Sequence, residues 1–246
     1  MELIVESLRK YGNRLSRSRP RMWVDYTHDS EADALLNNIK RYPHLFLLGV
    51  IADRQVKAQR AWMIPIHVAG RLGSPNFESM RGLRKQQWSR MLKGKHRFAK
   101  TIGEACFEGL RRVEKEYKSN ASRIWAGRPS SAELVSRFLE FQGIGPKLAT
   151  MAVNILSTRY DVPLADHYSV DISADVHVRR VFRRLDLVPP DATVDQVIFR
   201  ARALSPRFPG ALDRPAFEIG RNWCRSRIPL CGQCYMKDVC PSAIVT

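Results

Sequence analysis

Acidic residues are scarce in this sequence. It has 24 Asp and Glu residues against 41 Lys and Arg residues, so its formal net charge is +17 at pH 7 and its pI is near 10.2. A surface so poor in negative charge does not attract cationic partners and is drawn to polyanions. Nucleic acid is the leading candidate class. The alternative interpretation is a basic surface that is only solvated.

Long hydrophobic runs are also missing. The longest apolar run, Leu45–Ala52, is far too short to span a bilayer. The N-terminal segment has no signal-peptide pattern, because Glu2 and Glu6 interrupt its apolar residues. These two absences disfavour a membrane surface as the anionic partner, and we expect a soluble intracellular protein.

The sequence contains neither a long alternation of polar and apolar residues nor an internal repeat, which argues against a sheet or a repeat fold. Apolar residues recur instead at helical spacing, and 246 residues can bury a sizeable core without disulfides. We therefore expect an all-α fold. Helices are predicted for residues 2–16, 30–42, 45–52, several segments of 77–117, 130–142, 148–156, 175–185, 193–204 and 215–224, with a loop over residues 157–174.

Cysteine is rare, and its distribution is uneven. Four of the five cysteines fall within 17 residues, at positions Cys224, Cys231, Cys234 and Cys240. In an intracellular chain such a cluster indicates a metal site more often than disulfides. Thiolates bind either tetrahedral zinc or an iron–sulfur cluster, and composition leaves both open. The fifth, Cys106, belongs to an apolar helical pattern and is expected to be buried.

The most informative stretch is Phe141–Lys147, which reads Phe-Gln-Gly-Ile-Gly-Pro-Lys. Gly143 and Gly145 permit positive φ and close approach of backbone N–H groups to an anion. Pro146 suits the first position of the following helix. The positive end of that helix, together with Lys147, would then face whatever the turn binds. Partial burial of Lys147 is expected to favour its neutral, nucleophilic amine.

Three features together resemble one protein family. They are the Phe141–Lys147 turn, the Asp-Val-His-Val segment that starts at Asp175, and the intervals between the four cysteines. In order, residue type and spacing they resemble the endonuclease III branch of the helix–hairpin–helix DNA glycosylases, over roughly residues 33–240. This resemblance implies a six-helix barrel (33–157) that contains the helix–hairpin–helix motif (about 131–157). It also implies a second domain from residues 1–32 and 158–246, with a cluster loop at 224–240 and DNA between the two domains.

The resemblance also implies an activity and its residues. The expected function is excision of a damaged or modified base from double-stranded DNA, with abasic-site lyase activity, in base excision repair by a monomeric protein. Lys147 would attack the sugar to form a Schiff base, and Asp175 would accept its proton and stabilise the sugar cation. Gly143, Ile144 and Gly145 would bind DNA, and Gln55 would line the space around the flipped base. The four clustered cysteines would hold a [4Fe–4S] cluster.

Simpler interpretations stay open at these positions. Lys147 could contact only a phosphate, and Asp175 could be only a helix N-cap, for which Asp is well suited. The interval between them is longer than is typical of the family and contains other aspartates that could replace Asp175: Asp161, Asp166 and Asp171. His177 is expected to be structural. A monofunctional glycosylase for a mismatched or hypermodified base, and a DNA-binding protein without chemistry, are the alternative functions. Asp53 and Arg54, which differ from the small residues typical of the family before Gln55, leave the substrate base open.

Overall fold

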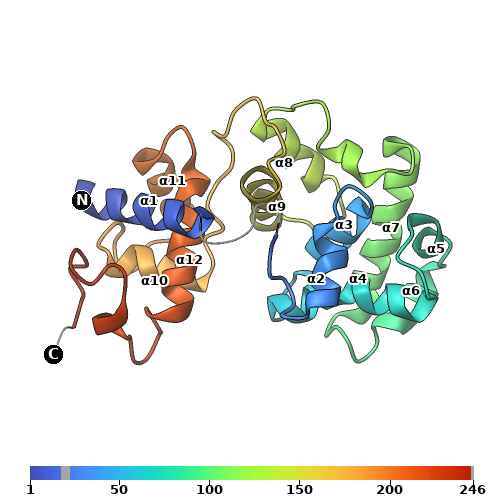
Figure 1. The fold of residues 1–246 in the computed structure, drawn as a ribbon, viewed down its shortest axis with the longest axis horizontal. Coiled ribbons are helices and arrows are strands. Elements are labelled where there is room, and N and C mark those ends of the chain that lie inside the picture. Colours follow the sequence, from blue (N-terminus) through green and yellow to red (C-terminus); the bar gives the residue numbers. More distant parts are fainter. Residues whose placement is uncertain (18–22, 245–246) are drawn as a thin grey trace.

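A computed structural model describes residues 1–17 and 23–244. Over this range the chain is helical and contains no β-strand, which confirms the predicted all-α class. Figure 1 shows the helices gathered in two lobes, with α9 between them. The elements are α1 (Glu2–Arg17), α2 (Ser30–Asn37), α3 (Pro43–Ala52), α4 (Ala58–Leu72), α5 (Phe77–Arg81), α6 (Lys85–Leu92), α7 (Ala99–Tyr117), η1 (Ala121–Ile124), α8 (Ser131–Leu139), α9 (Pro146–Arg159), α10 (Val176–Arg184), α11 (Val194–Leu204), η2 (Pro209–Leu212), α12 (Asp213–Asn222) and η3 (Cys231–Gln233).

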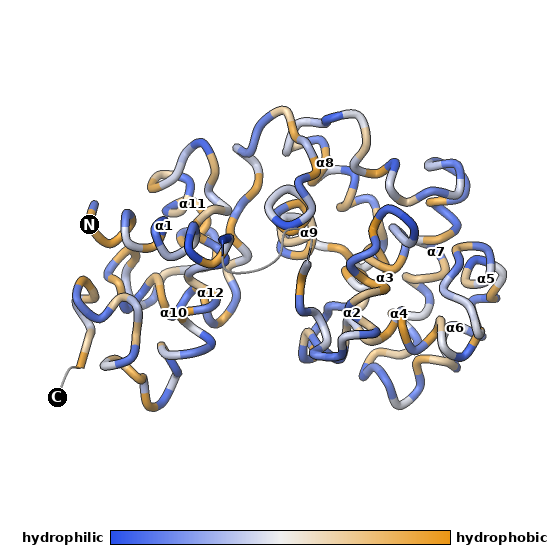
Figure 2. Tube along the Cα trace, viewed as in Figure 1, coloured by the Kyte–Doolittle hydropathy of each residue, from blue (hydrophilic) through white to orange (hydrophobic). Residues whose placement is uncertain are grey.

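The first lobe is built around α3, whose residues are all buried. This helix is apolar on every side, so only the interior of a core can accommodate it. Trp62 of α4 and Trp88 of α6 belong to the same buried cluster, and Cys106 of α7 is fully buried there, as predicted. In Figure 2 apolar and polar segments alternate along the helices of both lobes.

The second lobe joins the two ends of the chain (Figure 1). Its core combines Leu8 and Tyr11 of α1 with apolar side chains of α10, α11 and α12. The Tyr11 ring stacks on Tyr235 at a centroid distance of 4.5 Å, and Trp223 lies 5.9 Å from Tyr11. The N-terminal helix therefore fixes the segment that carries the four clustered cysteines.

The two buried clusters do not follow the expected domain limits closely. The cluster of the first lobe includes Tyr26 and continues through Tyr160 and Leu164 to Val170. The hydroxyl groups of Tyr26 and Tyr160 are 2.9 Å apart, which ties the segment before α2 to the end of α9. The division of the chain at residues 33 and 157 stays a prediction.

The segment between α9 and α10 holds the lobes together. α9 extends to Arg159, so the loop predicted for 157–174 begins three residues later than expected. The loop packs on the start of α8, where the Ser131 hydroxyl donates to Asp166 and accepts the Ser169 N–H at 2.9 Å. Farther along, the Gly210 N–H donates to the Val170 carbonyl at 2.7 Å. η2 is thereby fixed beside the loop and directly precedes α12.

Candidate nucleic-acid interface and active site

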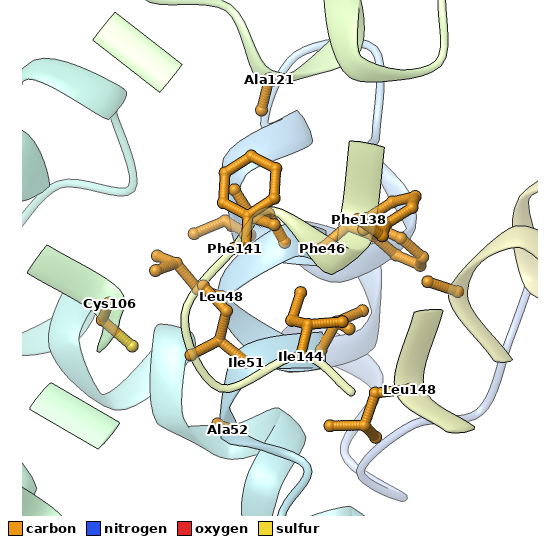
Figure 3. Close-up of a cluster of buried hydrophobic side chains, with 14 of the residues drawn as sticks. Phe46, Leu48, Ile51, Ala52, Cys106, Ala121, Phe138, Phe141, Ile144 and Leu148 are labelled. Carbon is orange, nitrogen blue, oxygen red and sulfur yellow. The ribbon is translucent and has the colours of Figure 1, made fainter. Parts of the chain in front are cut away.

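The turn between α8 and α9 is anchored from inside the first lobe. Figure 3 shows Phe138, Phe141 and Ile144 beside Phe46 and Ile51 of α3, in the same buried cluster. The Ile144 N–H donates to the Phe141 carbonyl at 3.0 Å, and the Ile144 side chain is only 5% exposed. Ile144 therefore holds the turn in the core.

The two glycines of this turn have different roles. Gly143 has φ +91°, a conformation that L side chains rarely adopt, as expected for the first glycine. Gly145 has φ −96°, so the positive φ that glycine permits is not used at this position. Gly145 is the N-cap of α9, is exposed, and has open space where a Cβ would be. Its absent side chain leaves the backbone open to an approaching ligand.

The start of α9 is free to receive an anion. No side chain caps this helix, and Pro146 occupies its first turn. The first N–H groups of a helix have no partner within the helix, and they carry the positive end of its dipole. Lys147 follows Pro146 with an exposed side chain, so the predicted partial burial of this lysine is wrong. The turn and Lys147 together present positive charge to solvent.

Asp175 is the N-cap of α10. Its Oδ1 accepts the N–H groups of His177 at 2.8 Å and Val178 at 2.9 Å, so the capping interpretation is confirmed. Both bonds use the same oxygen, which leaves Oδ2 outside the cap. Capping therefore leaves room for a second role of this half-buried carboxylate. His177 packs edge-on against Phe217 and lies 3.0 Å from Arg180, in keeping with a structural role.

The charge of Lys147 acts on two carboxyl groups that the sequence motifs did not identify as partners. Burial raises the pKa of Asp53, which follows α3, and Lys147 and a hydrogen bond with Trp62 oppose this rise. Burial and the nearby Asp175 raise the pKa of Asp213 to about 7, whereas the Ser173 N–H and Lys147 oppose the rise. Lys147 therefore lies within electrostatic range of carboxyl groups from both lobes.

Gln55 lies in the loop between α3 and α4, close in sequence to Asp53. It is exposed and has φ +54°. A non-glycine residue in this left-handed backbone conformation costs on the order of 1–3 kcal/mol of stability, and such strain is concentrated at functional sites. The strained backbone is compatible with the predicted role of Gln55 beside a flipped base, which stays a prediction.

The protein was compared with family models, with curated proteins and with solved structures. No family model and no curated protein matches the sequence. Solved structures do match. An endonuclease III–DNA covalent intermediate matches over 86% of this chain and 93% of its own, with 17% identity and a TM-score of 0.60. A thermostable thymine-DNA glycosylase matches over 98% and 95%, with 16% identity and a TM-score of 0.64. An 8-oxoguanine glycosylase/lyase of Clostridium acetobutylicum, in complex with DNA, matches over 86% and 69%, with 13% identity and a TM-score of 0.57.

The chain has the fold of these DNA glycosylases. The fold prediction made from the turn, Asp175 and the cysteine spacing is thereby confirmed. In this glycosylase fold, residues 1–17 and 23–244 include no helix that is long and apolar enough to cross a membrane.

Two of the three aspartates of the long loop are engaged elsewhere in this glycosylase fold. Asp166 accepts the Ser131 hydroxyl. Asp171 is buried and forms a two-point ion pair with Arg202, with distances of 2.8 and 2.7 Å. These contacts give Asp166 and Asp171 structural roles, and Asp161 is exposed. Asp175 is the aspartate of this segment that acts electrostatically on Asp213.

The four clustered cysteines are free thiols, all of them partly buried. The charges of Cys224, Cys231 and Cys240 contribute, after burial, to a raised pKa of Cys234, so the four sulfur atoms lie within electrostatic range of one another. Arg184 contacts two of them, donating to the Cys224 Sγ at 3.4 Å and accepting from the Cys240 Sγ through its carbonyl at 3.6 Å. Over the described part of the chain, no three His, Cys, Asp or Glu side chains are grouped closely enough to hold a metal ion. The donor set itself, four unbridged thiols, fits a four-thiolate metal group.

Proposed function

We propose that this protein is a DNA glycosylase that flips and excises a damaged or modified base and then cleaves the abasic strand by β-elimination. One observation carries the proposal: Lys147 is exposed at the uncapped start of α9, directly after the Gly143–Gly145 turn and within electrostatic range of carboxyl groups from both lobes. The basic surface and the fold shared with DNA glycosylases support it. Such a protein would act inside the cell on double-stranded DNA.

In this proposal the turn holds the DNA backbone. The open backbone at Gly143 and Gly145 and the positive end of α9 would bind a phosphate. Ile144 would contribute indirectly to DNA binding, because its buried side chain keeps the turn in place. The target nucleotide must leave the stacked duplex before its glycosidic bond can be reached, and Gln55 would then line the space around it.

Lys147 would be the nucleophile. Its amine attacks the sugar carbon that bears the base, and the electron pair of the glycosidic bond leaves with the base. The carboxylate of Asp175 stabilises the positive charge that develops on the sugar. Opening of the sugar ring gives a Schiff base with Lys147, and loss of a proton from the adjacent carbon expels the 3′ phosphate. Lys147 must be a neutral amine for the first step, so its proton has to move to an acceptor.

Cys224, Cys231, Cys234 and Cys240 would hold a [4Fe–4S] cluster. When bound, the cluster would cross-link the C-terminal segment, and its proposed contribution is structural rather than chemical. The segment packs on α1 through Tyr11, Trp223 and Tyr235. Arg225, Arg227 and Lys237 are exposed on the two loops between these cysteines and are available to contact DNA phosphates.

A monofunctional glycosylase is the second candidate. The likeness of the fold to a thymine-DNA glycosylase supports this candidate, because that protein is named for removal of a base alone. In that case water would be the nucleophile, activated by a carboxylate, and base release would occur without strand cleavage. The non-catalytic alternative predicts DNA binding with neither reaction.

Borohydride trapping on DNA with a single abasic site tests the proposal. The wild type should form a covalent adduct, and Lys147→Ala should not. Lys100→Ala is the matched control, because Lys100 is also exposed and is also the second residue of a helix, α7. An adduct that survives Lys147→Ala would contradict the assignment of this residue. Release assays with oxidised, deaminated, alkylated and hypermodified bases would then identify the substrate, and strand cleavage measured in the same reactions would separate the two candidates.

A further inference from the structure

Asp213 lies where the two lobes meet. It is the first residue of α12 and directly follows η2. The Asn154 side chain of α9 donates to the Gly210 carbonyl at 3.1 Å, and the Gly210 N–H donates to the Val170 carbonyl at 2.7 Å. A Cβ at Gly210 would come within 2.8 Å of the Asn154 Nδ2, so this approach needs glycine. The start of α12 is therefore held against the helix that carries Lys147.

The same junction brings Asp213 to the segment of Asp175. The Ser173 N–H donates to the Asp213 Oδ1 at 2.7 Å, and Ser173 is two residues before Asp175. The Ser173 hydroxyl is buried and has no hydrogen-bond partner among the described residues. A buried hydroxyl without a partner is unusual in a folded protein. The residue whose N–H binds Asp213 therefore carries a hydroxyl group that the fold itself does not use.

The two carboxyl groups have different surroundings. Asp175 accepts two N–H groups of α10 and is held at the start of that helix. Asp213 accepts one N–H group, lies beside Asp175 and is faced by Lys147 of α9, and its pKa is raised to about 7. Two charged groups from other helices act on it: Asp175 from the N-terminus of α10 and Lys147 from the first turn of α9. Neighbouring carboxyl groups in different surroundings are a recurring arrangement for acid–base chemistry.

We propose that Asp213 accepts the proton that Lys147 must lose before it attacks the sugar, while Asp175 stabilises the sugar cation. The proposal rests on the lyase function proposed above. In this step one N–H bond of the Lys147 ammonium breaks, its electron pair stays on nitrogen, and the proton forms an O–H bond on Asp213. The lysine side chain is flexible and solvent-exposed, so it can approach Asp213 and then turn to the DNA. The pair of carboxyl groups thus divides the two tasks that the sequence motif had assigned to Asp175 alone.

Single-turnover kinetics on abasic DNA, measured as a function of pH, test this division. The substitution Asp213→Asn keeps an oxygen that can accept the Ser173 N–H and removes only the proton acceptor. In the wild type the rate of Schiff-base formation should rise with pH through about 7, as Asp213 loses its proton. In Asp213→Asn this rise should disappear. At pH values above about 7 the rate should be lower than that of the wild type by about 100-fold or more, the usual contribution of a general base. The affinity for abasic DNA should not change.

Two further variants keep the experiment decisive. Asp213→Glu retains a titratable carboxyl group and should retain a pH-dependent rate, even if the rate is reduced. Asp195→Asn removes an exposed negative charge from α11 and should behave as the wild type. A wild-type rate and pH profile in Asp213→Asn would overturn the role of Asp213, while the adduct of the wild type and its loss in Lys147→Ala would still support the lyase. A wild type that forms no adduct would overturn both.

Discussion

Replacing Asp213 should make the protein more stable and less active at the same time. The pKa of Asp213 is raised from 3.8 to about 7, chiefly by burial. Between these two values the unfolded chain releases the proton while the folded protein keeps it, so stability falls as pH rises through this window. Above this pH window the folded protein bears the full free-energy cost of the ionised Asp213 carboxylate. A shift of this size corresponds to about 4 kcal/mol.

Asp213→Asn removes this cost. The variant should exceed the wild type in free energy of unfolding by about 1 kcal/mol near pH 4.5 and by about 4 kcal/mol near pH 8. For a chain of this length the difference near pH 8 corresponds to a rise in Tm of about 8–16 °C. Urea unfolding at the two pH values measures it, with Asp195→Asn as a control that should stay within about 0.5 kcal/mol of the wild type at both. An equal gain at both pH values, or no gain near pH 8, would refute the reasoning. A gain in stability with a loss of activity is the pattern expected for a strained functional site.

Three more predictions concern the turn, the junction and the cysteines. Gly143→Ala should lower stability by about 1–3 kcal/mol and weaken DNA binding, because its φ of +91° strains any other residue although a Cβ would have room; thermal unfolding and fluorescence anisotropy measure the two effects. Gly210→Ala should destabilise by about 1–3 kcal/mol or more through overlap with Asn154, whereas Gly70→Ala, with open space in α4, should stabilise by about 0.5–1 kcal/mol; equal effects in thermal unfolding would contradict the close approach. Protein purified without oxygen should be coloured and contain about four iron atoms per chain, and colourless protein with stoichiometric zinc would show that the four thiols bind the other metal.

Much of the site was predictable because its residues act locally. The turn needs glycine at Gly143 for a backbone reason and a helix start after Pro146, and both are encoded within a few neighbouring residues. The same holds for the cap at Asp175, whose bonds reach only two and three residues along the chain. The buried state of α3 follows from its apolar composition alone. For such features, the residue types of a short segment are enough to predict its conformation.

Burial and long-range contacts were not predictable in this way. Lys147 was expected to be partly buried, but the packing leaves it exposed, because the neighbours that would cover it come from other segments of the fold. Among the aspartates after α9, the contacts of Asp166 with Ser131 and of Asp171 with Arg202 became visible only in the folded chain. The spacing of residues in the sequence does not predict which distant residue a side chain will contact in the fold.

The sequence by itself determined the all-helical class, the glycine turn before α9, the cap and the group of four cysteines, since each depends on residues close together in the chain. Only the tertiary structure placed Asp213 beside the segment of Asp175 and within electrostatic range of Lys147. The Leu-Asp-Arg-Pro segment around Asp213 matches no motif, and this residue is 66 positions beyond the lysine. Its proton affinity depends on burial and on charges from α9 and α10, and these exist only once the two lobes have packed on the loop between them.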